Sequence, residues 1–184
     1  MRFAPLTAFL ILTILAAASS AAPASAASEE AALSQLKSPV TGDSMLNELM
    51  GKWTGEGVVR QSSGGAEEPV KCRLTNIWTA ENKLMKMQLA CRGIDYVFTA
   101  TSFIGRSGNV YRGSLTSSVN GDANVAGKRS GNGLAFNMVG NSPKGPVHSN
   151  LSLAIAGSRV TNIVQRTDPD TGQRYTALQV TMSR

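Results

Sequence analysis

The feature that most constrains this sequence is a succession of about ten short segments in which apolar and polar residues alternate. The segments start at Trp53 and continue to the C-terminus, and each is rich in β-branched or aromatic residues. Glycine, asparagine, aspartate or proline separates them, mostly at the interval of roughly 8–12 residues that is typical of antiparallel sandwiches and barrels. The pattern predicts an all-β protein, an antiparallel barrel of about 8–10 strands, with a sandwich of two sheets as the alternative.

The N-terminal residues have the features of a secretory signal peptide. Arg2 precedes an apolar run over residues 6–15, and Ala24-Ser25-Ala26 fits a cleavage site. The apolar run is shorter than the roughly 20 residues that a membrane-spanning helix needs. We expect residues 1–26 to be removed, the mature protein to be periplasmic or secreted, and no transmembrane span to remain.

The rest of the chain divides into a lead-in and one domain. Residues 27–41 are rich in alanine and serine without a sustained apolar pattern, so we expect a flexible lead-in. Residues 42–184 form the predicted single barrel domain, and a short helix comes first. Asp43 or Ser44 can cap this helix and Gly51 can end it. Its apolar residues share one face: Met45, Leu46, Leu49 and Met50.

The two cysteines and the strand pattern select the same hairpin register. If residues 70–80 and 83–92 form a hairpin, the alternation places Cys72 directly opposite Cys91. In an exported chain such a pair is expected to be oxidised. We therefore predict a structural disulfide rather than a redox pair, because the C-x-x-C spacing is missing.

One face of this hairpin points toward the expected core. Methionine adapts to varied ligand shapes, and a buried amide such as that of Asn76 needs a hydrogen-bond partner. The methionines are typical of ordinary core packing, with a ligand cavity as the functional alternative, which the buried amide supports. The candidate ligand-binding residues are Trp53, Asn76, Trp78, Met85 and Met87. The expected core comprises Trp53, Leu74, Trp78, Met87, Leu89, Phe98, Phe136, Leu151 and Val180.

The opposite face of the hairpin carries a basic patch. Its members are Lys71, Arg73, Lys86 and Arg92. Such a patch is either a solvated surface or a contact for anionic lipid, lipid A phosphates or an acidic partner protein.

The side chains that most enzymes and metal sites use are scarce in this sequence. One histidine and two cysteines provide no catalytic triad, Cys-His pair or tetrahedral zinc set. The segment Asp168-x-Asp170-x-Gly172 is interpreted as a turn rather than a calcium loop. The formal charge of +6 is spread along the chain, without the dense clusters of nucleic-acid-binding proteins. We expect no catalytic residue, no metal, no cofactor and no nucleic-acid partner.

The order of a short helix, Gly51-Lys52-Trp53 and antiparallel strands resembles the entrance of calycin barrels, the lipocalins and their relatives. The resemblance implies that Trp53 closes one end of the barrel, and that Gly55 and Gly57 let the first strand bend and pack closely. The stretches LMGKWTGEGVV, EEPVKCRL and LACRG also resemble a group of small exported proteins of alphaproteobacteria. That second resemblance implies a location and a fold but no activity.

The stretch GKWTGEG is also similar to the opening of nitrobindins, which are ten-stranded haem barrels. In that family one histidine close to the C-terminus binds the iron. The one histidine here is His148, 36 residues before the end of the chain. Strand alternation predicts that its side chain points outward or lies at the barrel rim.

Two function classes follow from this sequence. The first is a non-enzymatic barrel that binds a small apolar or amphipathic ligand of the cell envelope. The second is a protein-interaction module, such as a hydrolase inhibitor or a secreted factor that acts on a host; a haem-binding barrel is a distant alternative. An interior of roughly 300 Å³ or more would favour the first class, and a filled core with a large exposed apolar patch would favour the second.

Overall fold

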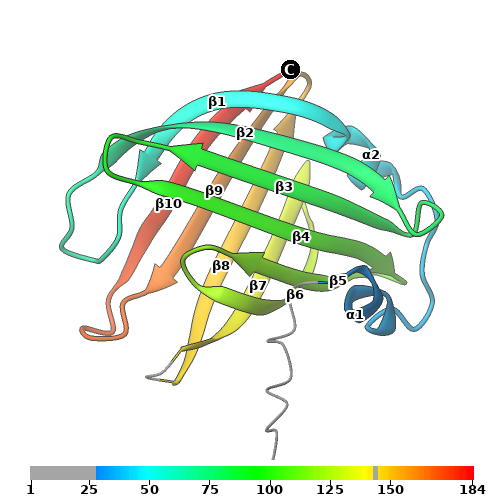
Figure 1. Cartoon of the computed structure of the whole chain (residues 1–184). Helices are drawn as coiled ribbons and strands as arrows, with labels where there is room; N and C mark the ends of the chain where they lie inside the picture. Colours follow the sequence, from blue (N-terminus) through cyan, green and yellow to red (C-terminus); the bar gives the residue numbers. More distant parts are fainter. Residues whose placement is uncertain (1–27, 143–144) are drawn as a thin grey trace, which may run out of the picture.

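Ten antiparallel strands close into a barrel (Figure 1). The structure is a computed structural model and describes residues 28–142 and 145–184, so the predicted signal peptide lies outside the described residues. Each strand pairs with its neighbours in sequence, and the first pairs with the last to complete the ring. The strands are β1 Gly51–Val59, β2 Glu68–Thr79, β3 Leu84–Arg92, β4 Val97–Ser107, β5 Val110–Ser117, β6 Gly121–Ser130, β7 Gly133–Ser142, β8 Gly145–Ala156, β9 Arg159–Thr167 and β10 Arg174–Ser183. The predicted antiparallel barrel is confirmed.

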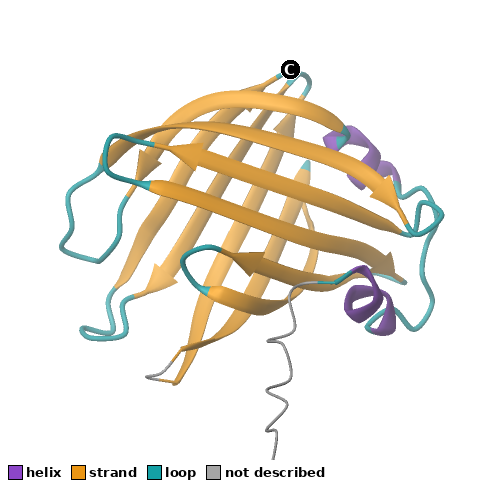
Figure 2. Cartoon of the chain, in the orientation of Figure 1, coloured by secondary structure: helices purple, strands orange, loops and turns teal. Residues whose placement is uncertain are grey.

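The short helix that the sequence predicts is α2, Ser44–Leu49, and it covers one end of the barrel (Figures 1 and 2). Asp43 is its N-cap, and the carboxylate accepts a hydrogen bond of 3.0 Å from the amide of Leu46. Gly51 adopts a φ of +100°, which favours glycine, and the chain passes from α2 into β1 there. The apolar face of α2 is buried against the barrel, as predicted: Met45, Leu46 and Leu49. We call this the α2 end, and the opposite end the open end.

The segment that we expected to be a flexible lead-in contains a second helix, α1, Glu29–Ser34. Ser28 caps it by accepting a hydrogen bond of 3.0 Å from the amide of Ala31. Ala32 and Leu36 are buried against Phe103 and its neighbours on the outer face of the barrel. The expectation fails because it considered local pattern alone, whereas α1 is stabilised by apolar side chains from strands far along the sequence.

Inward-facing side chains fill most of the barrel. Of the predicted core, six residues are buried: Trp53, Leu74, Met87, Phe136, Leu151 and Val180. The other three, Trp78, Leu89 and Phe98, are partly buried and pack against this core. No helix in the described part of the chain is long and apolar enough to cross a membrane.

Strand β1 lies close to β10 where its two inward glycines occur. A Cβ added at Gly55 would lie 2.6 Å from the Cα of Met182, and one at Gly57 would lie 2.7 Å from the Cα of Val180. Real Cβ atoms essentially never approach backbone so closely. The two glycines therefore permit the close approach of β1 to β10 that closes the barrel.

Candidate functional site

The α2 end of the barrel is closed by side chains that the sequence singled out. Trp53 is fully buried, and its Nε1 donates a hydrogen bond of 2.8 Å to the carbonyl of Leu49. The buried amide of Asn76 donates to the same carbonyl at 2.6 Å. Trp78 Nε1 donates to Asn47 Oδ1 at 2.7 Å. These bonds satisfy a carbonyl at the C-terminus of α2 and hold the helix over the barrel.

The five candidate ligand-binding residues lie together at this α2 end. Met85 and Met87 are buried in the same core cluster as Trp53. From outside, the guanidinium carbon of Arg184 lies 4.6 Å from the centroid of the Trp53 ring. We expected a ligand or water to be the hydrogen-bond partner of the Asn76 amide, but its Nδ2 donates to the Leu49 carbonyl of the helix instead. Its Oδ1 accepts no hydrogen bond from the described residues. Ligand binding by these residues stays a prediction.

A pocket of about 120 Å³ lies at the open end of the barrel. Strands β1, β4, β9 and β10 contribute most of its lining. Its apolar lining is Val59, Phe98, Val119, Val164, Ala177 and Leu178. Its polar lining is Arg60, Gln61, Tyr96, Asn120 and Arg166. A second pocket of about 40 Å³, lined by Leu115, Met138 and their neighbours, lies inside the barrel near the same end. The open end therefore offers an apolar hollow with a polar margin.

The two arginines of this open-end pocket differ in their partners. Arg60 forms an ion pair with Glu67, with 2.7 Å between the guanidinium nitrogen and the carboxylate oxygen. No described residue forms an ion pair or a side-chain hydrogen bond with Arg166. Burial raises the pKa of Tyr96, and the nearby Arg166 guanidinium opposes part of that rise. The positive charge of Arg166 therefore faces the pocket without a counter-ion among the described residues.

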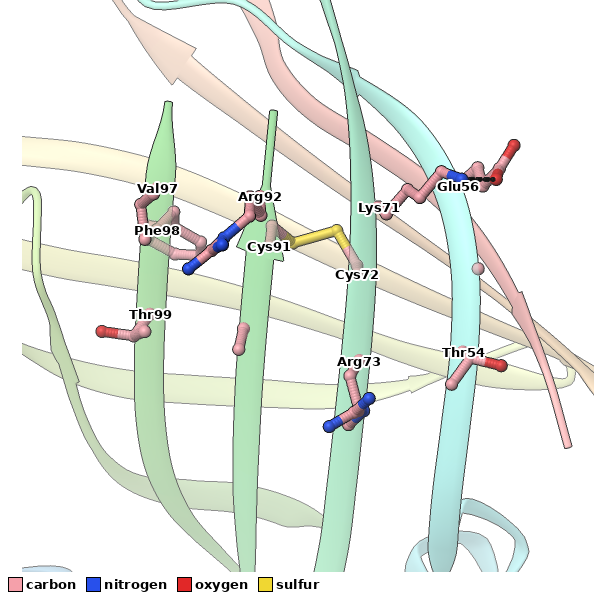
Figure 3. A pocket seen from close by; sticks show the side chains of 12 residues that line it. Thr54, Glu56, Lys71, Cys72, Arg73, Cys91, Arg92, Val97, Phe98 and Thr99 are labelled. Atoms are coloured by element: carbon pink, nitrogen blue, oxygen red, sulfur yellow. Dashed lines mark ion pairs between the residues drawn. A yellow bond between two sulfur atoms is a disulfide. The ribbon is translucent and has the colours of Figure 1, made fainter. Parts of the chain in front are cut away.

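A larger, shallow depression of about 690 Å³ lies on the outside of strands β1 to β4 (Figure 3). Three members of the predicted basic patch, Lys71, Arg73 and Arg92, line it. Its one carboxylate is Glu56, whose oxygen lies 3.4 Å from the Lys71 ammonium. Both of these side chains are largely exposed, so the pair is weak. The depression therefore keeps a positive surface.

The fourth member of the predicted patch, Lys86, lies elsewhere. It pairs with Ile77 near the other end of β3, six residues from Arg92, which is roughly 20 Å along a strand. Its ammonium lies 5.8 Å from the centroid of the Phe103 ring. Two apolar side chains are exposed at this site: Val97, 61% exposed, lines the depression, and Ile94, 85% exposed, lies next to it.

The predicted disulfide and hairpin register are confirmed. Cys72 and Cys91 are bonded and are directly paired residues of β2 and β3. Both are buried on the inner face, behind the basic depression. The disulfide therefore fixes the two strands that carry Lys71, Arg73 and Arg92.

The described residues include no group of three or more His, Cys, Asp or Glu side chains that could hold a metal ion. His148 pairs with Val139 and is exposed, as predicted, on the outer face of β8. It does not fit the role of an iron ligand inside the barrel. The carboxylate of Asp168 accepts hydrogen bonds from the amides of Ser63 and Asp170, and these bonds hold its pKa well below the ordinary value.

The open-end pocket was missed by the sequence analysis. The sequence could have indicated that Arg166 points inward, because alternation along β9 places it on the same face as Val160, Asn162 and Val164. Arg60 follows the end of β1, so strand alternation does not predict the direction of its side chain. The pocket brings together five separate parts of the chain, and closure of the barrel sets their proximity.

No family model and no curated protein matches this sequence. The fold is similar to that of a solved structure, Rv2717c from M. tuberculosis, with a TM-score of 0.59. The two chains are 12% identical, and the alignment covers 77% of this chain and 98% of that chain. At this identity the similarity establishes the barrel fold and nothing about activity.

Proposed function

We propose that this protein is a non-enzymatic binding barrel, periplasmic or secreted, which takes a compact apolar or amphipathic ligand into its open end. The observation that carries the proposal is the asymmetry of the barrel. One end is closed by α2 and Trp53, whereas the other has an apolar pocket with a polar margin. Ligand sites in proteins commonly combine an apolar hollow with a few polar groups that fix orientation, and they are common at the mouths of barrels.

The size of the pocket limits the ligand. Its volume of about 120 Å³ is below the roughly 300 Å³ that would favour a ligand site by volume alone, so the proposal rests on the asymmetry of the barrel and on the pocket lining. An engineered cavity of about 150 Å³ holds benzene, so the open-end pocket suits one ring or a short branched chain. A larger amphipathic ligand would leave its polar portion outside.

The residues that line the open-end pocket favour ligand binding over catalysis. In the part of the chain that the structure describes, no carboxylate, histidine or serine lines the open-end pocket. The arginine, tyrosine and amide groups present there can orient a ligand by hydrogen bonds. The calycin-like opening at Gly51-Lys52-Trp53 and the disulfide fit a small exported barrel. The relationship to calycins and the export of the protein are both part of the proposal.

The proposal is tested with 4-dimethylaminobenzonitrile, a neutral probe with a single ring that fluoresces more strongly in apolar surroundings. Val164→Trp would fill the open-end pocket, because Val164 lines it. Val139→Trp is the matched control, since Val139 is 41% exposed on β7. We expect the wild type and Val139→Trp to enhance the fluorescence and Val164→Trp to lose the enhancement. Equal enhancement in both variants would place the binding elsewhere and reject the proposal.

A second candidate function is an interaction module that contacts an acidic surface, either a partner protein or anionic lipid. Its support is the basic depression, which carries Lys71, Arg73 and Arg92 beside the exposed Ile94 and Val97. Cations with adjacent apolar side chains suit an anionic membrane surface or an acidic protein.

Co-sedimentation with phosphatidylglycerol vesicles tests the lipid form of this second candidate. The double variant Arg73→Gln/Arg92→Gln removes two charges from the depression, and Arg112→Gln/Arg159→Gln removes two exposed charges elsewhere. Binding that is lost in the first pair and kept in the second would support it. Equal binding by both pairs, or equal binding to phosphatidylcholine vesicles, would reject it.

A further inference from the structure

We infer that the open-end pocket selects an anionic ligand, a compact apolar group that bears one carboxylate, and that Arg166 binds the carboxylate. The inference rests on the proposed function and adds two points: the charge of the ligand and the residue that recognises this charge. Arg166 lies on β9, directly between Ser149 of β8 and Tyr175 of β10. Its side chain lines the same pocket as the apolar Phe98, Val164 and Leu178.

The first argument is that the charge of Arg166 is uncompensated. The Nε of Arg166 is buried and has no hydrogen-bond partner. No carboxylate of the described residues lies within 4.0 Å of its guanidinium. A half-buried guanidinium without an acceptor has lost part of its hydration, so an anion in the pocket would stabilise it.

The second argument is that the nearby acidic groups already have other partners. Asp168 follows Arg166 by two residues, but its carboxylate accepts hydrogen bonds from the amides of Ser63 and Asp170, at 2.9 and 3.0 Å. Glu68 accepts a hydrogen bond of 3.0 Å from the amide of Asp95. Neither carboxylate forms an ion pair with Arg166.

The third argument comes from the other arginine of the pocket. Arg60 also lines it, but Glu67 neutralises Arg60 across 2.7 Å. The Nε of Arg60 is also buried without a hydrogen-bond partner, so the two arginines differ in the ion pair: Glu67 holds Arg60, whereas no carboxylate of the described residues holds Arg166. A guanidinium presents a planar pair of N–H groups that matches a carboxylate.

The apolar part of the ligand follows from the pocket itself. A ring that enters the hollow would contact Phe98, Val164 and Leu178 and leave its substituent at the margin, where Arg166 and Tyr96 lie. Tyr96 and Phe98 stack with 6.4 Å between their ring centroids, so one wall of the pocket is aromatic. Benzoate fits this description, and benzyl alcohol is its uncharged counterpart.

The experiment compares the dissociation constants of benzoate and benzyl alcohol by following the amide resonances of Val164 and Ala177 in ¹⁵N-labelled protein. For the wild type we expect benzoate to bind about tenfold more tightly, the factor expected for one partly exposed charge-assisted contact. We expect Arg166→Gln to remove this preference and Arg166→Lys to keep part of it. Arg159→Gln, an exposed arginine on the same strand, is the matched control and should keep all of it.

The outcomes separate the inference from the function on which it rests. Binding of both probes with equal affinity in the wild type would overturn the role of Arg166 and leave the binding barrel intact. Binding of neither probe would overturn both. The comparison between probes is made in the wild type, so it stands even if an Arg166 variant folds poorly. A benzoate preference that persists in a folded Arg166→Gln would also overturn the assignment.

Discussion

At the scale of single residues, Asp43 connects α2 to the barrel wall. Its carboxylate caps α2, accepts a hydrogen bond of 2.9 Å from Arg106 of β4 and accepts one of 3.1 Å from the Tyr111 hydroxyl of β5. Asp43 is 3% exposed, so the contacts are screened little by solvent. The Asp43 side chain therefore links α2, β4 and β5.

Replacement of Asp43 by alanine should lower the free energy of unfolding by about 2–3 kcal/mol, because it removes a helix cap and leaves Tyr111 and Arg106 without their acceptor. Urea unfolding measures the change. Glu48→Gln, an exposed substitution on α2, should change stability by less than about 0.5 kcal/mol. Similar stability of the two variants would contradict the role of Asp43.

The same contact predicts how stability depends on alkaline pH. Burial, and then the negative charge of Asp43, raise the pKa of Tyr111 to about 12 from an ordinary value of 10.0. The folded protein thus holds this proton more tightly than the unfolded chain does. The stabilisation is fully present below pH 10 and is lost as the pH rises through about 12.

Tyr111→Phe lacks this ionisation, so its unfolding free energy should fall less steeply over that pH range than that of the wild type. Chemical unfolding at several pH values measures the two slopes. The comparison cancels the other groups that titrate at alkaline pH, because both proteins contain them. Parallel slopes would show that the pKa of Tyr111 is not raised by folding.

At the scale of elements, the closure of the barrel depends on the contact of β1 with β10. Gly57→Ala should destabilise the protein by about 1–3 kcal/mol, the cost of forcing extra volume into a packed interior. The added methyl group would overlap backbone atoms of Gln179 and Val180, which cannot move aside easily. Gly64→Ala is the control, since a Cβ at Gly64 in the β1–β2 loop meets nothing within 4 Å. Thermal unfolding of the two variants distinguishes them, and equal midpoints would contradict the account of β1.

The β2–β3 hairpin is the element that the sequence predicted in most detail. The hairpin register that places Cys72 opposite Cys91 also places Leu74 opposite Leu89 and Asn76 opposite Met87, and both pairs are observed. Prediction succeeded there because the partners are close in sequence and one face of each strand is apolar. Helix α1 was missed for the opposite reason, because Leu36 is buried against strands far along the chain.

Reduction of the Cys72–Cys91 disulfide should lower the unfolding free energy by roughly 3 kcal/mol, since it frees a loop of about 20 residues in the unfolded chain. Guanidinium unfolding with and without reductant measures the change, with thiol titration to prove reduction. The circular dichroism of the reduced protein in buffer should stay that of a barrel. An unchanged unfolding midpoint after complete reduction would contradict a stabilising role.

At the scale of the whole molecule, the chain forms a barrel with one closed and one open end, and a basic outer face. The sequence predicted the barrel, the Trp53 closure and three of the four cations assigned to one basic patch, because these follow from local alternation and from the resemblance at Gly51-Lys52-Trp53. It did not predict the open-end pocket. Arg60 directly follows β1 and Arg166 lies on β9, far apart in the sequence, and only the pairing of β1 with β10 brings β9 near β1.

The central claim, that the open end holds a ligand, is tested most directly by native mass spectrometry of protein purified from its own host. We predict a non-covalent adduct of low mass on the wild type and on Val139→Trp, and no adduct on Val164→Trp, whose side chain would occupy the open-end pocket. An adduct of the same mass retained by Val164→Trp, or wild-type protein that is free of any adduct in repeated preparations, would contradict the claim.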